Sequence, residues 1–150
     1  MQEYPHHYTV AASSQADGIV SLDSSMLESI NSAPPAEFGG PGDLWSPETL
    51  LVAAVADCFV LSFKAIARAS SLSWESLRCD VEGVLNRVDK VTQFTEFTLH
   101  ASLEISPEMN TEKAVRLLEK AENACLITNS LKSETHLKTS VTVSTNSKTT

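Results

Sequence analysis

The chain has 150 residues, of which 42% are hydrophobic and 20% are charged, so it is long and apolar enough to bury a core as one domain spanning 1–150. Its 19 acidic and 11 basic residues give a net charge of −8, which disfavours nucleic acid and anionic membrane surfaces as partners. The first residues lack the basic and apolar segments of a signal peptide, and three cysteines without an export signal indicate a cytoplasmic protein.

The first fifty residues predict short strands followed by a long loop. Segments 8–12 and 18–23 are predicted strands joined through Asp17-Gly18, a dipeptide typical of hairpin turns. A weaker pattern suggests a third strand at 25–30. Residues 31–43 are rich in proline and glycine, which predicts a loop. Because long irregular segments inside a domain are usually functional, we expect this loop to contribute to function.

A strongly apolar helix is predicted next, beginning at Ser46-Pro47 and ending near residue 70. Serine is a favoured N-cap, and proline is favoured at the first helical position. Apolar residues lie on nearly all sides of this helix, which predicts a central position covered by other elements. Asp57 and Lys64 interrupt the apolar run, which is shorter than the about 20 residues of a membrane span. We therefore expect a buried helix.

The second half of the chain predicts strands around another helix. Leu77, Cys79 and Val81 share one face of a strand over 77–84, and apolar residues alternate with polar ones from 97 to 105. A helix follows residue 110, and a last strand covers 137–143 before a tail that is expected to fray from about residue 145. This order predicts an α+β fold with mostly antiparallel sheets around the long helix.

Asn110 is the expected N-cap of that second helix. The apolar stripe of the helix ends at Cys125, so the Cys125 side chain is expected to face the interior. Cys58 lies near the middle of the first helix. A free cysteine among apolar residues usually packs as a small hydrophobic residue, and this remains an alternative for both thiols. Cys79 only alternates with polar residues on its strand, so we assign it to packing. Two buried thiols brought together by folding would support peroxide chemistry without a cofactor.

Glu48 lies at the start of the first helix, where acidic side chains interact favourably with the helix dipole. It precedes Cys58 by ten residues, which places the two about 15 Å apart along one helix at a rise of 1.5 Å per residue. If they share a site, Glu48 must come from a second subunit whose helix runs antiparallel. The nearly all-round apolarity of this helix suits such an interface.

Other chemistries have little support in the sequence. His6 and His7 lie near the chain start, and His100 and His136 fall on the polar sides of strands, so neither a metal site nor a Cys–His hydrolase is indicated. The segment 39–42 contains proline and precedes no phosphate-binding lysine, so nucleotide binding is not supported either. We expect no metal and no cofactor.

Four segments resemble motifs of the OsmC/Ohr family, the osmotically inducible and organic hydroperoxide resistance proteins: 39–40, 46–51, 56–59 and 122–130. The resemblance implies an intertwined homodimer with two active sites at the subunit interface. It also implies a cysteine peroxidase that reduces organic hydroperoxides and is recycled by a dithiol reductant. By position, Cys58 would be the peroxidatic cysteine, Cys125 the resolving cysteine and Glu48 the interface carboxylate.

The sequence departs from this family in the positions of its basic residues. Active peroxidases of the family pair the glutamate with an arginine from the N-terminal region, whereas this chain has no arginine before Arg68 and no lysine before Lys64. It therefore resembles an OsmC-like subgroup that lacks the N-terminal arginine. Arg78, Arg87 and Arg116 remain candidates for the missing cation. Two alternatives to a peroxidase follow: a binding protein that holds a small apolar or thiol ligand, and an inert domain.

Overall fold

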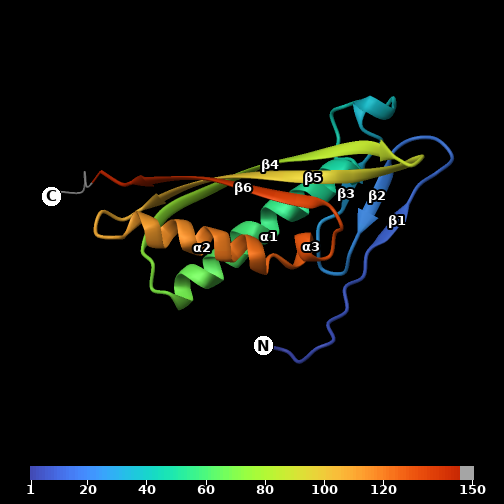
Figure 1. Ribbon diagram of the computed structural model, residues 1–150. Helices are drawn as coiled ribbons and strands as arrows, with labels where there is room; N and C mark the ends of the chain where they lie inside the picture. The colour runs from blue at the N-terminus through green and yellow to red at the C-terminus, as the bar shows by residue number, and fades with distance from the viewer. Residues whose placement is uncertain (146–150) are drawn as a thin grey trace. The chain divides into compact units, whose positions relative to one another are not determined.

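The computed structural model describes residues 1–145 of the chain (Figure 1). Its contacts define two compact units, Met1–Leu51 and Val52–Thr150, with the boundary inside the long helix α1 (Pro47–Ala69). Strands and helices occur together, so the predicted α+β fold is confirmed. That the whole chain forms a single domain stays a prediction. The predicted fraying of the tail falls on residues 146–150, outside the described range.

The N-terminal unit contains a small antiparallel sheet of order β1-β2-β3. Its strands are β1 (Ala11–Ser13), β2 (Val20–Asp23) and β3 (Ile30–Ser32). The hairpin between β1 and β2 is confirmed, and Gly18 adopts a φ of 102° there, which residues with a side chain rarely reach. The predicted strand at 25–30 is wrong in position. A turn occupies the first half of that segment, closed by a hydrogen bond from Leu27 N–H to the Ser24 carbonyl, and β3 starts only at Ile30.

The predicted loop over 31–43 is largely irregular, with one short 3₁₀ turn, η1 (Ala36–Phe38). The two ends of this loop are held together by a hydrogen bond of 2.9 Å from Ala33 N–H to the Trp45 carbonyl. Gly40 lies so close to Pro34 that an added Cβ would be 1.6 Å from the Pro34 carbonyl oxygen. Only glycine fits at this position.

Helix α1 begins as the sequence predicts. The Ser46 hydroxyl accepts from Thr49 N–H at 3.1 Å, and the Thr49 hydroxyl accepts from Ser46 N–H at 2.9 Å. This reciprocal pair is a capping box in which threonine replaces the usual glutamate. Pro47 then occupies the first helical position, where its missing N–H costs nothing.

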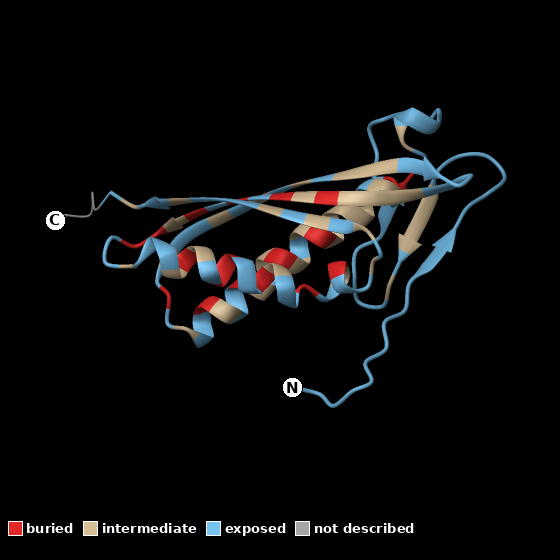
Figure 2. Cartoon of the chain, in the orientation of Figure 1, coloured by how far each residue is buried: buried red, intermediate tan, exposed pale blue. Residues whose placement is uncertain are grey.

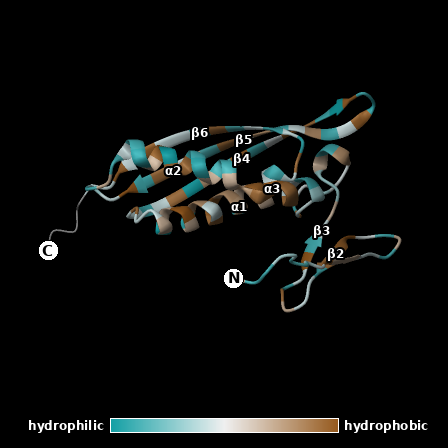
Figure 3. Cartoon of the chain, turned by 60° about the horizontal axis from the view of Figure 1, so that its bottom comes forward, coloured by the Kyte–Doolittle hydropathy of each residue, from teal (hydrophilic) through white to brown (hydrophobic). Residues whose placement is uncertain are grey.

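Within one chain, α1 buries only one stripe of residues, spaced four apart: Val55, Phe59, Phe63 and Ala67. Its most apolar stretch has a mean hydropathy of 2.1, yet only 22% of that stretch is buried. By length and composition α1 passes the test for a membrane span. The helix appears brown along most of its length in Figure 3. The expectation that other elements cover it on all sides is therefore not met within the single chain.

The C-terminal unit contains a second sheet of order β4-β5-β6. Its strands are β4 (Trp74–Val88), β5 (Val91–Ile105) and β6 (Glu134–Val143). β4 and β5 form an antiparallel hairpin, whereas β5 and β6 are parallel. The predicted alternation on β5 is confirmed by its buried residues, Phe97, Leu99, Ala101, Leu103 and Ile105. Figure 2 shows buried segments along the C-terminal sheet in red.

The parallel pairing requires a crossover from the end of β5 to the start of β6. Helices α2 (Thr111–Ala124) and α3 (Leu126–Asn129) supply it, and both lie on the same face of the sheet as the C-terminal part of α1 (Figures 1 and 3). The predicted N-cap is confirmed, because the Asn110 carboxamide oxygen accepts from two backbone N–H groups at 2.8 and 3.1 Å. The face of the sheet that carries the apolar residues of β5 is thus covered by helices.

Candidate thiol site

Cys58 lies on α1, next to the buried Phe59, and its side chain is half-buried. Its Sγ atom lies 4.0 Å from the hydroxyl of Ser62, one turn further along the helix. The thiol is therefore held on a rigid element while remaining partly accessible. Partial exposure leaves a thiol open to reagents from solution, which a fully buried thiol is not.

Cys125 occupies the corner between α2 and α3 and is fully buried. Its N–H donates to the Glu122 carbonyl at 3.2 Å. Its carbonyl accepts from Asn129 N–H at 3.0 Å and from the Thr128 hydroxyl at 3.2 Å. The corner fixes the backbone of Cys125, so its side chain points inward as the helical stripe predicts.

The fold brings the thiols of Cys58 and Cys125 together. The Cys58 thiol is among the groups that shift the pKa of Cys125, so the two side chains lie near each other. Burial is the main cause that raises the pKa of Cys125; hydrogen bonding with Thr128 opposes this, and the Cys58 thiol adds to it. Cys125 is therefore a protonated thiol at neutral pH. Both cysteines are free in the structure.

Cys79 belongs to the same neighbourhood, although the sequence assigned it only to packing. It lies on β4 opposite Ala101 of β5, on the face that the helices cover. Burial raises the pKa of Cys79 to about 11, with further contributions from Asp80 and Cys125. The inward alternation at 77–81 was the available signal, but proximity to Cys125 depends on the crossover and could not be derived from spacing.

Glu48 lies in the first turn of α1, and its Oε1 atom is buried without a hydrogen-bond partner among residues 1–145. A buried carboxylate oxygen left unpaired is costly, because it has lost water and gained nothing in return. Because α1 is continuous from Glu48 to Cys58, their spacing places them about 15 Å apart along its axis. That Glu48 of a second subunit completes the thiol site stays a prediction.

The arginines proposed as the missing cation are exposed in the described part of the chain. Arg78 makes a bidentate contact with Asp80, with Nη2 to Oδ1 at 2.9 Å, and both side chains are exposed. Arg87 and Arg116 are exposed as well. Neither lysine nor arginine is among the groups that shift the pKa of Cys79 or Cys125.

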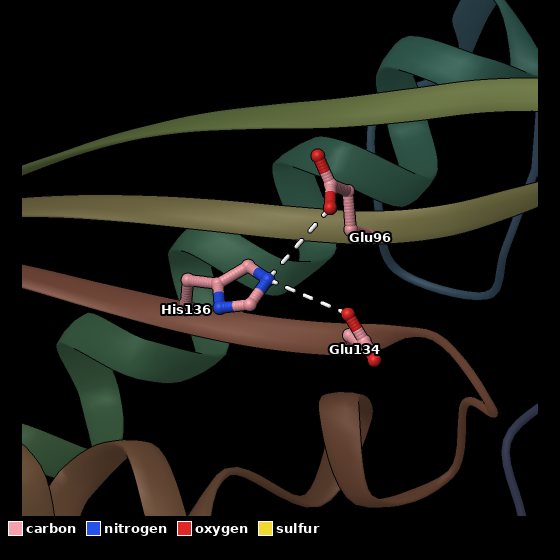
Figure 4. Close-up of side chains that lie close together, drawn as sticks. All are labelled: Glu96, Glu134 and His136. Atoms are coloured by element: carbon pink, nitrogen blue, oxygen red, sulfur yellow. Dashed lines mark ion pairs between the residues drawn. The ribbon is translucent and has the colours of Figure 1, made fainter.

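A second group of side chains lies on the opposite face of the sheet, where sequence spacing showed nothing. Glu96 of β5 and Glu134 and His136 of β6 place their ligand atoms within 4.8 Å of one another (Figure 4). Spacing could not find them, because they come from two strands whose parallel register brings them together.

Residues 40–140 match the family described as OsmC-like protein. The chain belongs to this family. An uncharacterized protein of Bacillus subtilis, YmaD, is 26% identical over 112 residues, which cover 73% of this chain and 75% of YmaD. Helix α1, which by length and composition alone could cross a membrane, lies wholly within the residues that match this family.

Solved structures show the same fold. An OsmC-like protein of unknown function from Vibrio cholerae superposes with a TM-score of 0.84 at 17% identity, over 91% of this chain and 100% of that one. An organic hydroperoxide resistance protein, OsmC, from Legionella pneumophila gives a TM-score of 0.73 at 26% identity, over 94% of this chain and 100% of that one. The OsmC/Ohr architecture expected from the sequence is thus confirmed.

Proposed function

We propose that this OsmC-like protein is a cytoplasmic, thiol-dependent peroxidase that reduces organic hydroperoxides and protects against oxidative stress. The observation that supports it most is the paired thiols of Cys58 and Cys125. The partial exposure of Cys58 supports a role in meeting the substrate, and the burial of Cys125 supports a role as the second thiol. The similar protein from Legionella pneumophila is described as an organic hydroperoxide resistance protein.

The first step is attack of the Cys58 thiolate on an oxygen of the hydroperoxide ROOH. The O–O bond breaks, a sulfenic acid forms on Cys58, and the alkoxide leaves as the alcohol ROH after taking a proton. Two electrons pass from the sulfur to the peroxide. The apolar residues around α1 suit an organic R group better than the small polar hydrogen peroxide.

In the second step, Cys125 attacks the Cys58 sulfenic acid. A Cys58–Cys125 disulfide forms and the hydroxyl group leaves as water, taking the thiol proton of Cys125. An external dithiol then reduces the disulfide by thiol–disulfide exchange and restores both thiols. The cycle therefore consumes ROOH and a dithiol, and produces ROH, water and a disulfide, with no metal or bound cofactor.

We propose that the active form is a homodimer. The uncovered apolar surface of α1 supports this, since Leu61 remains 57% exposed within one chain. The unpaired Oε1 of Glu48 supports it as well. If the two α1 helices pack antiparallel, Glu48 of the partner subunit approaches Cys58, and each site draws on both chains.

Peroxide consumption tests the enzymatic proposal directly. Wild type should consume cumene hydroperoxide in the presence of a dithiol, and Cys58→Ser should abolish turnover. Cys79→Ser is the matched control, because it removes a nearby thiol that has no part in the proposed cycle. Equal turnover by Cys58→Ser and wild type would rule out the peroxidase.

A second function, a non-catalytic binding protein for a small apolar or thiol ligand, is favoured by one observation. Neither lysine nor arginine is among the groups that shift the pKa of Cys79 or Cys125, whereas a thiolate in apolar surroundings needs a compensating charge. A ligand that co-purifies in native mass spectrometry, together with slow reaction of Cys58 with peroxide, would favour binding over catalysis.

A further inference from the structure

The outer face of the C-terminal sheet carries a group of ligands that the proposed peroxidase does not use. In the parallel register of β5 and β6, Glu96 lies directly opposite Glu134, and His136 lies opposite Thr98. All three charged or ligating side chains project from the same face, because they alternate with buried positions such as Phe97. Figure 4 shows them converging from the two strands.

The distances within this group suit a shared cation better than direct hydrogen bonds. His136 Nε2 lies 3.7 Å from Glu96 Oε2 and 3.7 Å from Glu134 Oε2. These separations exceed the 2.7–3.2 Å of a typical N–H···O hydrogen bond. Tetrahedral zinc with ligands at about 2.0–2.2 Å separates its ligand atoms by about 3.3–3.6 Å, so small side-chain rotations would bring all three atoms into position.

Charge gives an independent reason for a cation at this place. Two carboxylates directly opposite each other on neighbouring strands repel and destabilise the pairing. A protonated His136 would neutralise one of them at most, whereas a divalent ion neutralises both. The next pair on the same face is His100 opposite Lys138, so the basic side chains there lie beside the group rather than inside it.

We propose that Glu96, Glu134 and His136 form a binding site for a divalent transition-metal ion such as Zn²⁺. One imidazole and two carboxylates suit zinc, manganese or iron, whereas calcium and magnesium prefer oxygen ligands alone. Three protein ligands leave a position for water. The ion would join β5 to the start of β6, where Glu134 and His136 lie.

The test is Zn²⁺ titration by calorimetry of the full chain after removal of metal by a chelator. Because thiolates also bind zinc, the titration uses Cys58→Ser/Cys125→Ser, with folding checked by circular dichroism. One Zn²⁺ per chain is expected at this site. His136→Gln should weaken its binding at least about tenfold, as lost coordination contacts typically do. His100→Gln, a neighbouring histidine on the same face, should leave it unchanged.

A second measurement keeps the test valid if the double variant does not fold. Binding of Mn²⁺, which favours carboxylate over thiolate ligands, can be counted on wild type by electron paramagnetic resonance. If the double variant does fold, Zn²⁺ at 100 times its dissociation constant should raise the melting temperature of that variant by about 5–10 °C. Absence of binding, or binding that His136→Gln leaves unchanged, would overturn the proposal and leave an ion pair of His136 with the two glutamates.

Discussion

The pH dependence of disulfide formation follows from the surroundings of Cys125. Burial raises the pKa of this thiol above its ordinary value of about 8.5, so only a small fraction is thiolate at neutral pH. Because thiolate is the attacking species, each unit of pH below the pKa lowers the rate about tenfold. We expect the Cys58 sulfenic acid to resolve about 100-fold faster at pH 8 than at pH 6, with no plateau between them.

Thr128 provides a way to change this rate without touching either thiol. Its hydrogen bonding lowers the pKa of Cys125, so Thr128→Val should raise that pKa further. A lost hydrogen bond to a charged group is worth about 1.5 kcal/mol, which corresponds to about a tenfold loss of thiolate. A more basic thiolate is about threefold more nucleophilic, so the net effect at neutral pH is about threefold slower resolution.

The assay is stopped-flow detection of the sulfenic acid after a pulse of cumene hydroperoxide, at several pH values and without reductant. Wild type and Thr128→Val should give parallel lines of log rate against pH, with the variant displaced downward. Cys79→Ser should overlay wild type. A rate that levels off below pH 7, or a variant that resolves faster than wild type, would refute the assigned role of burial and of Thr128.

Three further outcomes are expected from the fold and the dimer proposal. Gly40→Ala should lower the melting temperature strongly, because the new Cβ would collide with the Pro34 carbonyl oxygen; an unchanged melting temperature would contradict the loop geometry. Phe59→Ala should cost about 3–5 kcal/mol of unfolding free energy in denaturant titrations, since this ring is fully buried, and a cost below about 1 kcal/mol would contradict its packing. Leu61→Glu should give a folded monomer in light scattering, because this exposed side chain lies on the α1 surface proposed to form the dimer; a persistent dimer would place the interface elsewhere.

Local signals predicted much of the fold. The start of α1 was predictable because Ser46 and Pro47 are suited to a helix N-terminus whatever surrounds them. The buried face of β5 was predictable because alternation has a period of two along any strand with one covered face. The same reasoning placed Cys125 inward at the end of α2.

Features that depend on pairing between distant segments could not be predicted. The start of β3 depends on its pairing with β2, where Ile30 lies opposite Leu22, and the weak pattern of residues 25–30 did not reveal it. The parallel register of β5 and β6 brings together Glu96, Glu134 and His136, although nothing in their spacing indicates a site. The apolar surface of α1 is another such feature. Its composition predicts burial but does not say what covers it.

The mass of the intact protein after one equivalent of cumene hydroperoxide tests the central claim most directly. The account predicts a loss of two hydrogen atoms in wild type, and a linked pair of peptides containing Cys58 and Cys125 after digestion. Cys125→Ser should instead gain one oxygen atom on Cys58. Added oxygen in wild type without a disulfide, or a disulfide that joins other cysteines, would contradict the assignment of Cys125 as the partner of Cys58.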